Sequence, residues 1–159
     1  MAELEPVWFR IDRVPAEATY ALRHQVLRPH APLSAVRLPG DDDPATGTFA
    51  ALTADGEVVG SAIVRPEACP WQPDVAGAWR LRGMATAESM RGQGVGAHVL
   101  RATIAYVVLE GGQLIWCNAR MPAARFYQRE GFLAEGEPWD DPQLGPHVAM
   151  WRQVELPED

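Results

Sequence analysis

The chain has 159 residues, 47% of them hydrophobic, and a formal net charge of −7 at pH 7. This length and composition predict one globular domain over residues 1–159, and the negative charge argues against nucleic acid as a partner while favouring a cationic substrate such as an amine. The chain contains no run of about 20 apolar residues, so we expect no membrane span. Its acidic start lacks the apolar core of a secretion signal, and its two cysteines lack metal-ligand spacing. We therefore expect a cytoplasmic protein with no disulfide and no bound metal.

Alternating helical and strand-like apolar patterns predict a mixed sheet with helices on its faces. Pro15 stands at the favoured first position of a helix, and Pro29 ends that helical pattern. Asp55-Gly56 separates two strand-like runs and is typical of a hairpin turn. Gly131 follows the last helical pattern, where a left-handed residue commonly ends a helix. In chain order, the predicted elements are a strand at 7–11, a helix at 15–28, a loop at 30–46, strands at 48–52 and 57–64, a proline-rich loop at 65–77, a strand at 79–86, a helix at 95–110, a strand at 114–118, a helix at 122–130, and strands at 132–139 and 147–154.

The most informative segment is a glycine-rich turn, Arg91-Gly92-Gln93-Gly94-Val95-Gly96. It lies between the strand predicted at 79–86 and the helix predicted at 95–110. A glycine-rich turn at a helix start exposes backbone N–H groups and the positive end of the helix dipole. Such a turn binds phosphate oxygens. We therefore predict that a phosphate-bearing ligand docks where this strand is followed by this helix.

Two other phosphate-binding patterns match this turn less well. A nucleotide-hydrolase loop requires Lys followed by Ser or Thr after its last glycine, whereas Ala97 and His98 follow Gly96 here. A dinucleotide-binding pattern matches Gly92, Gly94 and Ala97. However, further residues separate its first glycine from the strand, and no acidic residue stands at the end of the next strand. The dinucleotide pattern stays an alternative.

Several segments together resemble the GNAT N-acetyltransferase superfamily. Residues 91–97 are similar to its acyl-CoA loop, whose pattern is Gln/Arg-x-x-Gly-x-Gly/Ala, and a strand-like segment precedes them as in that family. Strand-like Leu114–Asn118 follows the helix, and Ala123–Phe132 resembles the family's ending A-x-x-F/L-Y-x-x-x-G-F. The resemblance covers the segment from Trp79 to Phe132, and the combination is more specific than any one piece.

The resemblance implies an α+β protein with the GNAT-like acyl-CoA N-acyltransferase fold, a central mixed, mostly antiparallel sheet flanked by helices. It implies an enzyme that transfers the acetyl group of acetyl-CoA to a primary amine by direct attack on the thioester, without a metal. The acceptor would be a small-molecule or peptide amine, and homodimers are common among such domains. A CoA-binding regulatory or interaction module without turnover is the alternative, because phosphate-loop residues fit both functions.

The resemblance also assigns residues to the cosubstrate acetyl-CoA. The glycine turn would hold the pyrophosphate, and the strand before it would offer backbone groups to the pantetheine arm. Many family members carry an Asn seven residues before the motif Tyr. Here that position is Arg120, and Asn118 lies nine residues before the Tyr, so either side chain is a candidate contact. The predicted cofactor-binding residues are Met84, Ala85, Thr86, Arg91, Gly92, Gln93, Gly94, Val95, Gly96, Ala97 and Asn118.

Tyr127 is the candidate proton donor in the motif, since a phenol with a pKa of about 10 can protonate a CoA thiolate. The alternative is an ordinary helical aromatic packed under the sheet. An amine is mostly protonated at neutral pH, so a carboxylate or histidine must accept its proton. Glu88, which follows the strand at 79–86, and His147, at the start of the last predicted strand, are the predicted catalytic bases, with Glu67 a further candidate.

Substrate-binding residues are predicted in the two loops of the first half. The acidic run Asp41, Asp42 and Asp43 would attract a cationic amine, although such a run is also typical of a solvated loop. Trp71, in the proline-rich loop, is predicted to form a wall of the substrate pocket. Cys117 lies within a strand-like run and is predicted to be a small buried apolar group rather than a nucleophile.

Overall fold

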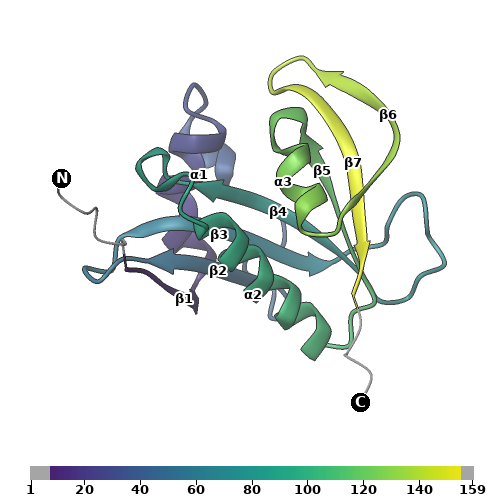
Figure 1. Ribbon diagram of the computed structural model, residues 1–159, viewed down its shortest axis with the longest axis horizontal. Coiled ribbons are helices and arrows are strands. Elements are labelled where there is room, and N and C mark those ends of the chain that lie inside the picture. Colours follow the sequence, from purple (N-terminus) through teal and green to yellow (C-terminus); the bar gives the residue numbers. More distant parts are fainter. Residues whose placement is uncertain (1–7, 155–159) are drawn as a thin grey trace, which may run out of the picture. The chain divides into compact units, whose positions relative to one another are not determined.

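In a computed structural model, residues 8–154 are described and form strands, α-helices and short 3-10 helices (η) (Figure 1). In chain order, the elements are β1 (Arg10–Arg13), η1 (Ala16–Thr19), α1 (Tyr20–Leu27), η2 (Leu33–Val36), β2 (Gly47–Leu52), β3 (Val58–Pro66), β4 (Ala78–Thr86), η3 (Glu88–Met90), α2 (Val95–Leu109), β5 (Leu114–Arg120), η4 (Met121–Ala123), α3 (Ala124–Arg129), β6 (Leu133–Asp141) and β7 (Gly145–Gln153).

The strands are hydrogen-bonded in the order β1-β2-β3-β4-β5-β7-β6. β1 pairs antiparallel with β2, so that Arg10 lies opposite Leu52. β5 has a parallel partner, β4, on one side and an antiparallel partner, β7, on the other. β6 pairs antiparallel with β7 at the edge. The sheet is therefore mixed and mostly antiparallel, as predicted.

The described chain divides into two compact units. The first unit holds residues up to 63 together with residues 83–103, and the second holds residues 64–82 and those from 104 onward. β3, β4 and α2 each run from one unit into the other. The single domain predicted over residues 1–159 stays a prediction.

The core of the first unit is formed by buried β2 and by the start of α2, which packs on β3. β2 is buried along its whole length. A Cβ on Gly60 would stand 2.8 Å from Val95 Cγ1 and 3.2 Å from Val99 Cγ2. Glycine at this position lets the helix approach the strand closely. The contact fixes the first turns of α2, directly after the glycine turn.

The core of the second unit lies around β5, which is buried from Leu114 to Cys117. Trp116 packs with Cys69, Ala78 and Leu114, and its Nε1 donates a hydrogen bond to the carbonyl oxygen of Glu67 at 2.9 Å. Helix α3 packs beside β6 and β7 within this unit (Figure 1). This packing holds the helix that carries the predicted proton donor.

Each predicted helix and strand has a counterpart, with shifted ends. The strand predicted at 7–11 is β1, whose extent follows its pairing with β2; its predicted first residue, Val7, lies outside the described residues. The helix predicted at 15–28 is divided, because buried Thr19 donates its hydroxyl to Ala16 O at 2.7 Å and closes a 3-10 turn before α1 begins. Gly131 has a φ of +90°, as predicted for the residue that ends a helix.

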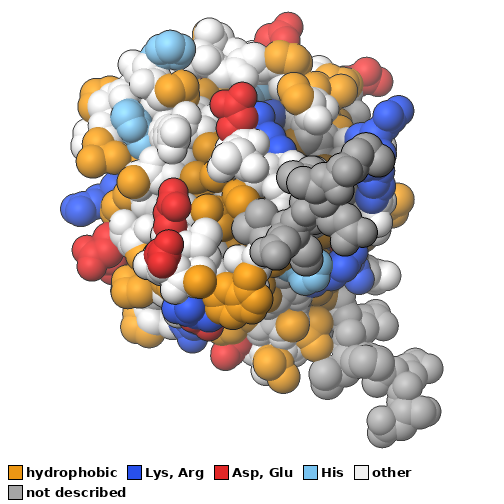
Figure 2. Space-filling view, turned by 60° about the vertical axis from the view of Figure 1, so that its left-hand side comes forward, with side chains coloured by type: hydrophobic (Ala, Val, Ile, Leu, Met, Phe, Trp, Pro, Cys, Tyr) orange, Lys and Arg blue, Asp and Glu red, His pale blue; other side chains and the backbone are white. Residues whose placement is uncertain are grey.

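The visible face of the described residues carries no large patch of a single charge (Figure 2). Figure 2 shows charged side chains of both signs scattered over the visible face among apolar and neutral ones. Within residues 8–154, no helix combines the length and the apolarity that a membrane crossing requires.

Candidate functional site

The glycine turn connects the end of β4 to the start of α2 and is anchored at both of its ends. The N–H of Ala87 donates to Val59 O at 2.8 Å, and Met90 of η3 is buried. Residues 91–94 are exposed, and Val95 is buried where α2 begins. The turn is thus fixed by buried groups on either side and open to solvent between them.

Gly92 and Gly94 adopt backbone conformations that favour glycine, with φ angles of +79° and +80°. Among the described residues, no heavy atom beyond Gly92 and its two chain neighbours lies within 4 Å of the place where a Cβ on Gly92 would stand. At Gly94 the nearest atom to that place is Nδ1 of His98, at 3.6 Å. Because no side chain of residues 8–154 fills the space over these glycines, a ligand can approach the backbone closely.

The first turn of α2 supplies hydrogen-bond donors next to this space. The N–H of His98 donates to Gly94 O at 3.1 Å. The N–H groups of Val95, Gly96 and Ala97 precede that bond at the start of the 15-residue helix and have no acceptor within it. They also lie at the positive end of the helix dipole. Open glycines and outward N–H groups together fit a pyrophosphate.

The segment Met84–Thr86 is set off from the rest of β4 by Gly83, which has a φ of +62°. A positive φ inside a strand interrupts the extended backbone. The carbonyl oxygen of Gly83 accepts a hydrogen bond from Ser61 Oγ at 2.8 Å, and Ala85 is buried. Sequence reasoning missed Gly83, although a lone glycine inside a strand-like run is a known sign of such an irregularity.

Tyr127 lies in α3, in the second unit, and is buried. Its ring centroid lies 5.2 Å from that of Phe126 and 5.3 Å from that of Phe132. Burial raises the pKa of Tyr127 well above its usual value, and nearby Cys117 raises it further. The phenol therefore stays protonated at neutral pH, as a proton donor must, although the same packing also fits a core aromatic.

Asn118 and Arg120 lie on the same face of β5, because side chains alternate along a strand. Asn118 is exposed opposite Ala149, and Arg120 is half-buried opposite His147. Cys117, on the other face, is buried, and burial raises its pKa to about 12. The side chain is thus a thiol at neutral pH, in agreement with its predicted role as an apolar group.

The candidate bases occupy different environments. Glu88 begins η3 and is exposed. His147 is buried in β7, with Nδ1 2.8 Å from Gly145 O and its ring stacked on Trp139 at a centroid distance of 5.8 Å. Glu67 accepts a hydrogen bond from Arg80 at 3.0 Å, so its carboxylate already has a cationic partner.

The acidic run is divided by burial. Asp41 is buried, and its Oδ2 accepts a hydrogen bond from the Tyr20 hydroxyl at 2.8 Å and lies 3.7 Å from Arg23 Nη1. Asp42 and Asp43 are exposed. The two exposed carboxylates are therefore the ones that an incoming cation can meet.

Trp71 is half-buried in the loop between β3 and β4. Its ring packs edge-to-face on Trp116, with centroids 5.7 Å apart and an interplanar angle of 78°. Its Nε1 is buried and has no hydrogen-bond partner among the described residues. Trp71 thus borders the core of the second unit, and its role as a substrate-pocket wall stays a prediction.

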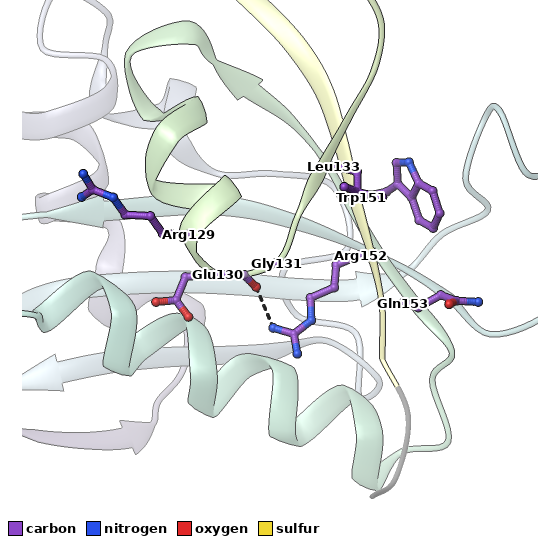
Figure 3. A pocket seen from close by; sticks show the side chains of 7 residues that line it. All are labelled: Arg129, Glu130, Gly131, Leu133, Trp151, Arg152 and Gln153. Atoms are coloured by element: carbon purple, nitrogen blue, oxygen red, sulfur yellow. Dashed lines mark hydrogen bonds between the residues drawn. The ribbon is translucent and has the colours of Figure 1, made fainter.

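A groove of about 510 Å³ lies at the end of α3 beside β7. In Figure 3, the side chains of Arg129, Trp151 and Arg152 point in different directions, and Arg152 donates a hydrogen bond to Glu130 O at 2.7 Å. The polar groups do not converge on one point, so we assign no ligand to this groove. Within the described part of the chain, no cluster of three or more His, Cys, Asp or Glu could hold a metal ion.

Comparison with known proteins identifies the family to which the chain belongs. A model of the acetyltransferase (GNAT) family matches residues 11–132, which include the glycine turn and Tyr127. The chain belongs to the GNAT family. GNAT enzymes are N-acetyltransferases that use an acyl-CoA, and the predicted family and enzyme class are thereby confirmed.

Individual relatives agree with this assignment. The chain is 34% identical over 145 residues to the uncharacterized N-acetyltransferase YitI of Bacillus subtilis (strain 168). The matched segment covers 91% of this chain and 95% of that protein. A crystal structure of a putative N-acetyltransferase from Lactobacillus plantarum superposes with a TM-score of 0.74 at 21% identity, covering 92% of this chain and 98% of that one. An aminoglycoside 6'-N-acetyltransferase complexed with coenzyme A superposes with a TM-score of 0.73 at 15% identity, covering 94% and 99%. These structural matches confirm the GNAT fold.

Proposed function

We propose that this GNAT protein transfers the acetyl group of acetyl-CoA to a primary amine of a small molecule or peptide. The observation that carries the proposal is the exposed turn with open, positive-φ glycines at Gly92 and Gly94, mounted on the start of α2. Bound acetyl-CoA supplies an acetyl thioester that an amine can attack. We also propose a cytoplasmic location, with which the free thiols of Cys69 and Cys117 agree. A homodimer is a further part of the proposal.

In this proposal, two adjacent segments of the first unit hold acetyl-CoA. The N–H groups of residues 92–97 bind the pyrophosphate, and Arg91 contributes a positive charge at the exposed start of the turn. Backbone groups of Met84–Thr86 bind the pantetheine arm, and one of their N–H groups polarises the thioester carbonyl. Asn118 adds a polar contact from β5.

Tyr127 acts in this proposal as the general acid. The hydroxyl is protonated at neutral pH and can give its proton to the departing thiolate, although its raised pKa makes it a weaker acid than a free phenol. Glu88 and His147 are the proposed bases for the amine, acting directly or through a water. Exposed Asp42 and Asp43 attract the cationic amine before it loses its proton, and Trp71 contributes to the pocket wall.

A panel of amines tests the proposal. The full chain is incubated with acetyl-CoA and each of a set of polyamines, amino acids, aminoglycosides and peptides, and thiol release is followed against a control without amine. Amine-dependent release is expected for at least one class. If acetyl-CoA binds but no amine increases thiol release, the chain is a CoA-binding module without turnover.

A further inference from the structure

Arg23, in α1, is a buried guanidinium that has no part in the proposed acid, base or cofactor contacts. Its side chain is 2% exposed. Its Nη2 donates to Val36 O at 2.6 Å, and its Nη1 lies 3.7 Å from Asp41 Oδ2. One side chain thus ties α1 to both ends of the segment 36–41, which leads directly into exposed Asp42 and Asp43.

The same side chain packs on the strand proposed to hold acetyl-CoA. A Cβ on Gly83 would stand 3.1 Å from Arg23 Nε and 3.4 Å from Arg23 Cδ. The carbonyl oxygen of Gly83 is held from another side by Ser61 Oγ. Glycine therefore does two things here: it permits the positive φ, and it leaves room for Arg23 directly before Met84.

The partners of Arg23 are themselves fixed. Asp41 Oδ2 also accepts hydrogen bonds from the Tyr20 hydroxyl at 2.8 Å and from the Leu38 N–H at 3.0 Å. Burial lowers the pKa of Arg23, and the facing Asp41 carboxylate opposes that shift. A buried charge is tolerated only when it is paired, and the planar guanidinium fork can hold several acceptors in one geometry.

We propose that Arg23 is a positioning residue that couples the loop carrying Asp42 and Asp43 to the Gly83 irregularity of β4. The inference rests on the proposed function for the roles of this loop and this strand. Loosening the Arg23 contacts should loosen residues 37–43 and 83–86 together. Binding of CoA next to Gly83 should in turn reduce the mobility of the loop that carries Asp42 and Asp43.

Hydrogen exchange followed by mass spectrometry tests the coupling on the full chain, with Arg23→Met compared with wild type. Without ligand, Arg23→Met is expected to accelerate exchange in residues 37–46 and 83–87 by on the order of tenfold, with little change elsewhere. The matched control is Arg37→Met, since Arg37 is an exposed arginine of the same loop that lies over the Tyr20 ring at 5.8 Å. The control should leave exchange in residues 83–87 unchanged.

Coenzyme A itself is the second probe. In wild type, CoA should slow exchange in residues 91–97 and also in residues 37–46. In Arg23→Met, protection of residues 91–97 should persist and protection of residues 37–46 should be lost. Gly83→Ala provides a reciprocal variant, because its Cβ would crowd Arg23 Nε at 3.1 Å and Ile63 Cγ2 at 3.2 Å. It should accelerate exchange in residues 37–46.

Two results would overturn the coupling. One is unchanged exchange in residues 37–46 in both folded variants. The other is acceleration spread evenly over the whole chain, which would mean a general loss of stability. If CoA protects no part of residues 91–97 in wild type, the proposed function fails, whereas the comparison without ligand still decides the role of Arg23.

Discussion

The imidazole Nδ1 of His98 lies 2.8 Å from the carbonyl oxygen of Gly94, one helical turn earlier. A Cβ on Gly94 would stand 3.6 Å from the same nitrogen. The ring is held by Phe9, whose centroid is 5.5 Å away at an interplanar angle of 81°. His98 therefore borders the space over the glycine turn without filling it.

Gly94→Glu should abolish CoA binding while the protein stays folded. The new side chain would occupy the space over the turn and bring a negative charge to the pyrophosphate. The positive φ of +80° would add backbone strain, on the order of 1–2 kcal/mol of stability. Isothermal titration with CoA measures the affinity, and circular dichroism checks the fold.

Gly56→Glu is the matched control for that variant. Gly56 has a φ of +84° and lies in the turn between β2 and β3, and its Cβ position has no neighbour within 4 Å in the described part of the chain. It should lose a similar amount of stability and keep its affinity for CoA. Wild-type affinity in folded Gly94→Glu would remove the glycine turn from the site.

Acetyl-CoA should raise the melting temperature of the wild-type protein. A ligand at about 100 times its dissociation constant adds about 2.7 kcal/mol, which for a domain of this size corresponds to a shift of roughly 5–10 °C. NADH and ATP should give smaller shifts, because no acidic residue stands at the end of the next strand and no lysine follows the last glycine of the turn, as their binding patterns require. A shift with NADH as large as that with acetyl-CoA would favour the dinucleotide pattern instead.

Tyr127→Phe should lower kcat by on the order of 10²–10⁴-fold, which is typical for loss of a general acid. The ring contacts with Phe126 and Phe132 are kept, so the melting temperature and the affinity for acetyl-CoA should change little. Steady-state kinetics on the acceptor found in the amine panel would show a lower kcat at a near-constant KM for acetyl-CoA, which marks an interaction made in the transition state.

Tyr106→Phe serves as the comparison, since Tyr106 lies in α2 and packs edge-to-face on Trp79 with centroids 5.7 Å apart. This variant should keep its kcat. If Tyr127→Phe also turns over at the wild-type rate, the proton comes from water or another group. If it unfolds, Tyr127 is a core aromatic whose hydroxyl is structural.

Stability should fall as the pH rises above about 9, partly because of Cys117. Burial raises the pKa of this thiol from 9.0 to about 12, so the folded state holds the proton more tightly than the unfolded state. The contribution is complete below pH 9 and is lost between pH 9 and 12, at about 1.4 kcal/mol per pH unit. Between pH 8 and pH 10, the free energy of unfolding measured with urea should fall less in Cys117→Ala than in wild type. The fall that remains in the variant should come in part from Cys69, because burial also raises the pKa of that thiol. Equal losses in the two proteins would contradict this account.

The parts of the fold that local chemistry determines were predictable from the sequence. Gly131 ends α3 with a left-handed residue, and Asp55-Gly56 marks the turn between β2 and β3. The start of α2 follows from the glycine turn. The division of the first helix at Thr19 was not predictable, because it depends on a hydroxyl turning back to Ala16 O.

The candidate site was predictable only where a motif describes the backbone. The open glycines at 92 and 94 follow from their spacing, and their positive φ angles agree with it. A run of three aspartates does not predict that Asp41 is buried against Arg23 while Asp42 is exposed. Such differences arise from contacts between segments that are distant in sequence, which a local pattern does not encode.

Product analysis of a complete reaction tests the central claim most directly. The full chain, acetyl-CoA and the best amine of the panel are incubated together, and free CoA and acetylated amine are quantified in the same sample by mass spectrometry, with Gly94→Glu in parallel. The account predicts equal amounts of the two products from wild type and neither above background from Gly94→Glu. Free CoA without acetylated amine, or no release despite bound acetyl-CoA, would contradict it.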